Sequence, residues 1–190
     1  VSAADAPRSL EDLLNPKYKG KFVMPDPTQH TTTLQWLASL YKIMGKEKAQ
    51  RFIQDLGASK PFMVESFAPA AERVSTGETP IAISLIPYTV TYADKGAPVD
   101  YVRLGKMLST GQYLALSKKP NHPNGAKAFI DFFLSDESMR ILAKMGEFVN
   151  RKGIYPPLPD ADKIQAVEMD DFDAKEFKEK TQEFQKIFLK

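Results

Sequence analysis

The sequence predicts an α/β protein with a largely parallel sheet and further helices at its C-terminal end. Short apolar or β-branched runs alternate with segments whose apolar residues recur at helical spacing, which is typical of parallel strands joined by helical crossovers. The composition is that of a globular protein, with 43% hydrophobic and 26% charged residues. A chain of 190 residues suits one large domain or two small lobes.

The first elements follow from local signals. Ser9 and Asp12 have the spacing of a capping box, which predicts a short helix that ends at Asn15-Pro16. The run Gly20–Met24 predicts a strand, and Thr31, Thr32 or Thr33 can cap the helix that follows. That helix is indicated by apolar residues at Leu34, Leu37, Ala38, Leu40, Tyr41 and Met44. After Gly45, a second helix is expected at Lys46–Leu56, and Gly57 is expected to stop it.

Two further strand–helix pairs follow. Pro61–Val64 predicts a short strand, and Ser66 can cap a helix over Phe67–Thr76. The apolar and β-branched run Thr79–Ile86 predicts a strand that is buried on both faces. Pro87 then opens a helix that ends near Gly96.

The second half of the chain predicts two more strands and three helices. The strands are expected at Val99–Leu104 and Gln112–Ser117. Helices are expected at Pro123–Leu134 and Asp136–Met145, with Ser135 as the N-cap between them. The C-terminal helix Asp173–Leu189 is amphipathic. Its buried face is expected to contain Ala174, Phe177, Phe184, Ile187 and Phe188.

Composition excludes several function classes. The net charge of +2 argues against a strongly basic nucleic-acid-binding protein. The run Ile81–Ile86 is too short to cross a bilayer, and the absence of cysteine excludes disulfides, thiolate metal sites and thiol catalysis. Val1–Pro7 has neither the basic nor the apolar region of a signal peptide, so we expect a mature or cut chain, or a piece of a longer one.

A candidate ligand site lies at three strand-to-helix junctions. These are Asp26–Thr33, Glu65–Ala68 and Ile86–Thr89. In a parallel sheet with right-handed crossovers, all three lie at the carboxyl ends of the strands, where helix N-termini offer free N–H groups and the positive end of a dipole. Hydroxyls gather there, at Thr31, Thr32, Thr33, Ser66, Tyr88 and Thr89. Each can simply cap its helix, but their convergence favours a site for an anion or polar small molecule.

Two aromatic residues at these junctions have alternative interpretations. His30 can bind a ligand or a metal, although an ordinary loop histidine is the simpler interpretation, since the chain has only two histidines. Tyr88 can be a core or rim aromatic, but Pro87 directs it toward the end of the strand, so a ligand role is equally open.

Catalytic signatures are weak. The chain contains no G-x-S-x-G, P-loop, G-x-G-x-x-G or H-E-x-x-H motif. Ser39–Lys42 matches S-x-x-K, but this segment lies within a predicted helix and has no companion motif. We therefore expect a protein that is not an enzyme.

Five segments carry a family resemblance, and their order along the chain is more specific than any one of them. They are Pro7–Lys21, Val74–Glu78, Lys95–Val99, His122–Ser135 and Asn150–Ile154. The chain resembles bacterial periplasmic solute-binding proteins of ABC importers, in the cluster whose members take ferric iron, thiamine, phosphonates or sugar phosphates.

The resemblance implies two α/β lobes that close on a ligand, with the N-terminal part of the first lobe absent here. Residues 1–7 would be a hinge segment and residues 8–104 the second, ligand-binding lobe. Residues 105–155 would return to the first lobe as a remnant, and the tail and helix at 156–190 would dock on the second lobe. The remnant would need a partner chain, a swapped copy or the missing segment to cover its apolar face.

The resemblance also implies a periplasmic location, or a lipid-anchored extracellular one, and an ABC permease as partner. Ferric-binding members carry two adjacent tyrosines where this sequence has Pro87-Tyr88-Thr89. Fe³⁺ favours phenolate oxygens, so the presence of only one tyrosine at this position weakens the case for iron. If iron is the ligand, we expect Tyr88 to bind it. We therefore expect a small anionic or polar solute bound by Thr31, Thr32, Thr33, Ser66, Tyr88 and His30, with ferric iron as the alternative.

Two functions of other classes compete with solute binding. An enzyme on this scaffold would need a positioned nucleophile or base, and the sequence offers no good pair. The effector-binding lobe of a transcription regulator would need a DNA-binding segment, and none is recognisable in the 190 residues.

Overall fold

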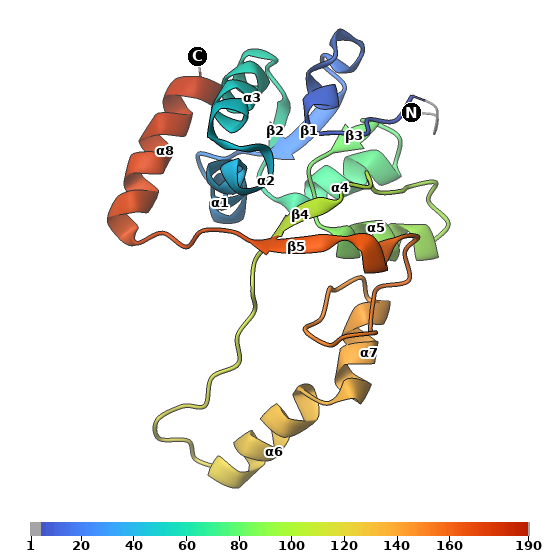
Figure 1. The fold of residues 1–190 in the computed structure, drawn as a ribbon, viewed down its shortest axis with the longest axis vertical. Coiled ribbons are helices and arrows are strands. Elements are labelled where there is room, and N and C mark those ends of the chain that lie inside the picture. Colours follow the sequence, from blue (N-terminus) through green and yellow to red (C-terminus); the bar gives the residue numbers. More distant parts are fainter. Residues whose placement is uncertain (1–4, 190) are drawn as a thin grey trace.

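The computed structural model describes residues 5–189 as one α/β body and a helical arm (Figure 1). The body is built on three strands, β1 (Phe22–Pro25), β2 (Phe62–Val64) and β3 (Ile81–Ala82). All three are parallel, in the order β2-β1-β3. No helix among residues 5–189 is long and apolar enough to cross a membrane. The predicted fold class is confirmed.

The third strand is shorter than expected. The sequence predicted Thr79–Ile86, but only Ile81 and Ala82 pair with β1, at Phe22 and Val23. The N–H of Ile83 adds one more bond to the carbonyl of Val23, at 2.9 Å. The chain then turns into helix α5 (Ile86–Asp94), so the last residue of the predicted strand begins the helix.

The helices after β1 and β2 form largely where their spacing predicted. The expected single helix after β1 is two helices, α1 (Thr31–Ser39) and α2 (Tyr41–Met44). They are followed by α3 (Lys46–Ala58) and, after β2, by α4 (Phe67–Ser75). Ser9 and Asp12 form the reciprocal backbone bonds of a capping box at a 3₁₀ turn, η1 (Glu11–Leu14), which a second turn, η2 (Pro16–Tyr18), follows.

Gly57 does not stop a helix, contrary to the prediction. It lies inside α3 and is buried. A Cβ on Gly57 would lie 2.5 Å from Ile187 Cγ2 and 2.8 Å from the Ile187 carbonyl oxygen. Glycine is therefore needed here because the C-terminal helix α8 (Ala174–Phe188) approaches α3 closely.

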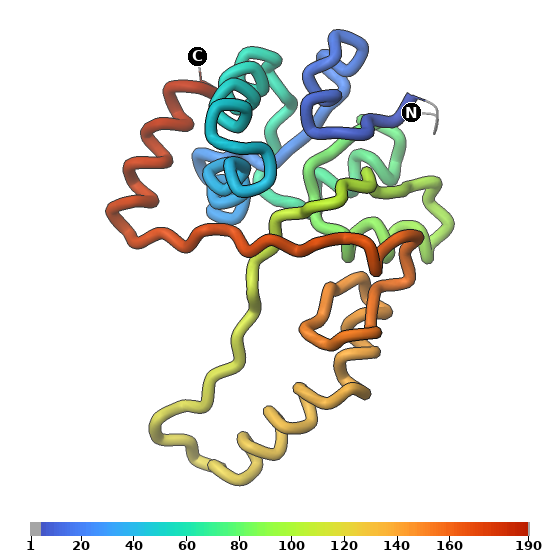
Figure 2. The backbone as a smooth tube through the Cα atoms, viewed as in Figure 1, coloured from blue at the N-terminus to red at the C-terminus, as the bar shows by residue number. Residues whose placement is uncertain are grey.

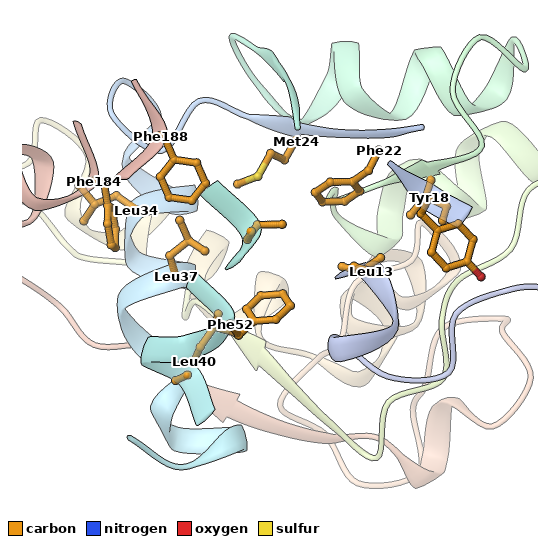
Figure 3. Close-up of a cluster of buried hydrophobic side chains, with 13 residues drawn as sticks. Leu13, Tyr18, Phe22, Met24, Leu34, Leu37, Leu40, Phe52, Phe184 and Phe188 are labelled. Carbon is orange, nitrogen blue, oxygen red and sulfur yellow. The ribbon is translucent and has the colours of Figure 1, made fainter. Parts of the chain in front are cut away.

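The core lies between the sheet and the helices α1, α3 and α8 (Figure 3). Leu34, Leu37 and Leu40 meet Phe52 and Met24 there, at the spacing that predicted a buried helical stripe. Helix α8 covers this core with Phe184 and Phe188, and its N-terminus has a full capping box between Asp173 and Glu176. The predicted buried face is confirmed for these two phenylalanines, and Phe177 and Ile187 are partly buried against the same core, whereas Ala174 is exposed.

A second, two-stranded sheet joins the body to the arm. Strand β4 (Lys106–Ser109) pairs in parallel with β5 (Gln165–Glu168), although about sixty residues separate them. Figures 1 and 2 show the chain leaving the body after β4 and coming back through β5. The third 3₁₀ turn, η3 (Ala161–Lys163), immediately precedes β5.

The two strands predicted around β4 are wrong. Residues 99–104 pair with no strand; the Tyr101 hydroxyl bonds the carbonyl of Pro159 instead, and Arg103 pairs with Asp160. Residues 112–117 are exposed throughout, and no described strand pairs with them. Their sequence pattern favours a strand, but a strand forms only where a neighbouring strand pairs with it.

The arm consists of two helices, α6 (Pro123–Phe133) and α7 (Asp136–Lys144). Both are confirmed, as is Ser135 as the cap between them, since its hydroxyl accepts from the Ser138 N–H at 3.3 Å. The apolar cluster buried in this part is small and lies around Met139, Ala143 and Ile154.

A polar cluster fixes the segment between β5 and α8 to the helices of the body. The carboxylate of Asp170 pairs with Lys42 and accepts from the Tyr41 hydroxyl at 2.9 Å. The N–H of Asp170 donates to the buried Ser39 hydroxyl at 2.8 Å. This cluster gives Ser39 and Lys42, the ends of the S-x-x-K match, a structural role.

Removing the Asp170 charge is expected to make the free energy of unfolding depend less on pH in the acidic range. Burial acts to raise the pKa of Asp170, but the bonds from Lys42 and Tyr41 outweigh it and lower the pKa. A carboxyl whose pKa is lowered on folding stabilises the protein above its unfolded pKa, of about 3.9, and loses this effect as the pH falls through its folded pKa. Urea unfolding should show Asp170→Asn to be less stable than wild type at neutral pH, with the difference shrinking toward about pH 3. An equal difference at both pH values would contradict this role.

Candidate functional site

The three predicted junctions lie at one edge of the body. Because β1 is the central strand and both neighbours run parallel to it, the carboxyl ends of all three strands meet there. The N–H of Asp26, just after β1, donates to the carbonyl of Val64, the last residue of β2, at 2.8 Å. The N-termini of α1, α4 and α5 follow directly from these ends.

Side-chain contacts bring the junctions together. The rings of His30 and Phe67 meet edge to face with centroids 4.7 Å apart, which joins the start of α1 to the start of α4. The hydroxyl of Ser84, between β3 and α5, donates to the Phe67 carbonyl at 3.0 Å. Phe67 therefore contacts the first junction and the segment that leads into the third.

The cap of α1 is His30, not one of the three threonines, which occupy the first turn of the helix. Its ring Nδ1 accepts from the Thr33 N–H at 3.3 Å and lies 2.9 Å from the Thr33 hydroxyl oxygen. Histidine is a rare cap because an imidazole seldom reaches the N–H of the third residue, so sequence reasoning favoured the threonines. Burial lowers the pKa of His30, which keeps the ring neutral at pH 7.

The remaining site residues differ in exposure. Thr31 is exposed, whereas Thr32, Ser66 and Tyr88 are half-buried. Ser66 occupies the N-cap position of α4, but its hydroxyl makes no capping bond. Thr33 is fully buried against His30, so it supports the histidine rather than facing solvent.

The backbone at the start of α5, which includes Tyr88, packs against the end of α7. Tyr88 lies in the first turn of α5, where its N–H donates to the Leu85 carbonyl at 3.1 Å. A Cβ on Gly146, at the end of α7, would lie only 2.7 Å from the Pro87 Cα. Because Gly146 also has a φ of +99°, this close contact between the arm and α5 requires glycine.

Metal-binding side chains are sparse. Residues 5–189 contain no group of three or more His, Asp or Glu side chains that could hold a metal ion. Glu65 is exposed at the second junction. It lines a surface hollow of the β2–α4 region together with Pro69, Glu72 and Arg73.

The sequence as a whole decides the family. The family described as bacterial extracellular solute-binding protein matches residues 1–175. The chain belongs to this family. Its fold is the periplasmic-binding-protein fold, as the resemblance of its segments predicted.

Solved structures agree with this fold. The periplasmic binding protein P5PA is 26% identical, with a TM-score of 0.57, over 96% of this chain and 61% of P5PA. Iron-bound HitA from Pseudomonas aeruginosa is 24% identical, with a TM-score of 0.61, over 97% of this chain and 63% of HitA. AfuA from Actinobacillus pleuropneumoniae, with fructose 6-phosphate bound, is 23% identical, with a TM-score of 0.64, over 97% of this chain and 60% of AfuA.

A fourth relative is matched over a smaller share of its own length. An uncharacterized protein of Haemophilus influenzae is 25% identical over 146 residues, which are 75% of this chain and 42% of that protein. The chain therefore spans less than two thirds of the length of each of these four relatives.

Proposed function

We propose that this solute-binding protein captures a small anionic or polar solute at the carboxyl edge of its three-stranded sheet and delivers it to an ABC permease. The observation that carries the proposal is the meeting of three helix N-termini, those of α1, α4 and α5, at one edge. Each start presents the positive end of a helix dipole, and free backbone N–H groups are available mainly at α1 and α4, because α5 has Pro87 and its Tyr88 N–H already bonds the Leu85 carbonyl. Together the three starts favour bound negative charge.

The side chains at this edge suit the same kind of ligand. Thr31, Thr32, Ser66 and Tyr88 provide hydroxyls, and no carboxylate other than Asp26 and Glu65 belongs to the three junctions. Asp26 is already engaged, since its Oδ1 accepts from both the N–H and the hydroxyl of Thr28. A phosphate or carboxylate would therefore meet mainly donors. Thr33 would act on the ligand only indirectly, because it is buried and supports His30.

Ferric iron is the competing ligand, because HitA was solved with iron bound. Tyr88 would be its phenolate ligand in this chain, and Glu65 a carboxylate one. The position before Tyr88 is Pro87, where a second phenol would be expected. We favour the anion because donors outnumber hard anionic ligands at the edge.

We propose that closure of two lobes accompanies binding, as in the two-lobed architecture of the family. The ligand-binding lobe would comprise residues 8–104, preceded by a hinge segment at 1–7. Residues 105–155 would belong to the first lobe, and residues 156–190 would return to the second. The parallel pair β4–β5, where the chain leaves and returns, supports a boundary near 105, whereas the return strand begins only at Gln165. A periplasmic or lipid-anchored extracellular location and the absence of catalysis follow from the same proposal.

The arm exposes a large apolar surface, which we propose is covered by polypeptide equivalent to the unmatched part of the longer relatives. Its exposed side chains are Phe129, Phe132, Leu134, Ile141 and Met145, and the segment that leads into it adds Tyr113, Leu114 and Leu116. Such a surface is unusual on a monomer.

Replacing Phe129 and Ile141 together by serine is expected to weaken binding of a hydrophobic dye such as ANS to the isolated chain several-fold. Both side chains are more than half exposed, so the free energy of unfolding should change by less than about 1 kcal/mol. Dye fluorescence and urea unfolding measure the two effects. If the double variant binds the dye as strongly as wild type, the arm is not the surface to which the dye binds.

Native mass spectrometry of the purified chain tests the proposal for function. A retained small organic mass, released on denaturation, would support an anionic solute and identify its class. Retained iron with an orange, tyrosinate-type absorption band that Tyr88→Phe abolishes would support the competing ligand. Steady turnover of a candidate ligand would overturn solute binding as the function.

A further inference from the structure

The capping bond of His30 determines which ring nitrogen carries the proton. A backbone N–H can only donate, so Nδ1 must present its lone pair to Thr33 and carries no proton while the cap is in place. The Thr33 hydroxyl, 2.9 Å away, can donate to the same nitrogen. In the neutral ring the proton must then be on Nε2.

The ring is held in this orientation from two sides. Thr33 is fully buried below it, and Phe67 packs against it edge to face. No residue among 5–189 forms a hydrogen bond with Nε2, and the side chain is half-buried at the edge where the three junctions meet. The Nε2–H is therefore an oriented donor at the candidate site.

We propose that His30 is a specificity-determining residue: its cap commits it to donate Nε2–H to an acceptor oxygen of the ligand and prevents it from coordinating a metal. A histidine that binds a metal offers a lone pair and normally donates its other ring N–H to a second partner. Here the other nitrogen is itself an acceptor, so the available nitrogen is protonated. This inference rests on the proposed anion site and extends it: the ligand carries a phosphate or carboxylate group near the start of α1.

The protonation of the ring can be measured without any ligand. Long-range ¹H–¹⁵N NMR spectra of the full chain at neutral pH should show His30 as the neutral tautomer protonated at Nε2. A ring protonated at Nδ1 would overturn the inference, whatever the protein binds.

Substitution separates the donor from the cap. Ser is a good cap but lacks both the imidazole donor and the ring contact with Phe67, so the thermal unfolding midpoint of His30→Ser should fall less than that of His30→Ala. His30→Ser should weaken binding of fructose 6-phosphate about tenfold or more, as expected for a lost hydrogen bond to a charged group. His30→Ala loses both the cap and the donor, and should lower affinity and stability together.

The outcomes distinguish this inference from the proposed function. If wild type binds fructose 6-phosphate or inorganic phosphate and His30→Ser binds it equally well, the donor role is wrong and the anion site stands. If wild type binds neither, and Fe³⁺ supplied as the nitrilotriacetate complex binds instead, the anion site is wrong and the donor role falls with it. Loss of Fe³⁺ binding in His30→Ser would directly contradict the exclusion of metal coordination.

Discussion

The double substitution Thr32→Val with Tyr88→Phe is expected to weaken ligand binding by more than tenfold while the protein remains folded. Thr32 lies in the first turn of α1 and Tyr88 in the first turn of α5, so the pair spans two of the three junctions. Each change removes one hydroxyl and keeps the shape of the side chain. A hydrogen bond to a charged ligand contributes about 1.5–3 kcal/mol, so loss of even one of the two corresponds to roughly tenfold.

Calorimetric titration with fructose 6-phosphate measures this effect. The matched control is Thr76→Val with Tyr92→Phe, which removes the same two hydroxyls at the opposite ends of α4 and α5. The control should bind like wild type. Equal affinity of all three proteins would show that the junction hydroxyls do not contact the ligand.

Phe184→Ala is expected to have the largest effect on stability. Phe184 is only 1% exposed and meets Phe188 edge to face, with centroids 6.2 Å apart, where α8 covers the core. Truncating a buried phenylalanine leaves a cavity and costs about 3–5 kcal/mol. Because α8 is the last element of the body, this loss should also release the C-terminal helix from α3.

Urea unfolding followed by circular dichroism measures the cost. Phe129→Ala is the control, since Phe129 is 56% exposed on the arm and its truncation should change the free energy of unfolding by less than about 1 kcal/mol. Similar small losses in both variants would mean that α8 contributes little to the core.

The parallel sheet and the meeting of its three junctions could be predicted from the sequence. Apolar strands followed by capped helices leave few topologies, and the right-handed crossover rule places every strand end at one edge. The same local signals placed α6, α7 and the cap Ser135 correctly. These elements depend mainly on neighbouring residues.

Features that depend on distant residues could not be predicted. Gly57 resembles a helix stop in sequence, and only the approach of Ile187, 130 positions later, shows why a glycine lies inside α3. Residues 112–117 have the pattern of a strand, but pairing requires a neighbour that the described residues do not supply. His30 was considered as a ligand or a loop residue, and its capping role follows from the rotamer that brings Nδ1 to Thr33.

The most direct test of the anion site is an NMR titration of the ¹⁵N-labelled chain with fructose 6-phosphate. We expect the largest amide shifts in all three helix starts, at residues 31–33, 66–68 and 88–89, because the ligand would contact the N-termini of α1, α4 and α5 together. Shifts confined to a single helix start, or centred on the arm, would contradict a site formed by the three junctions.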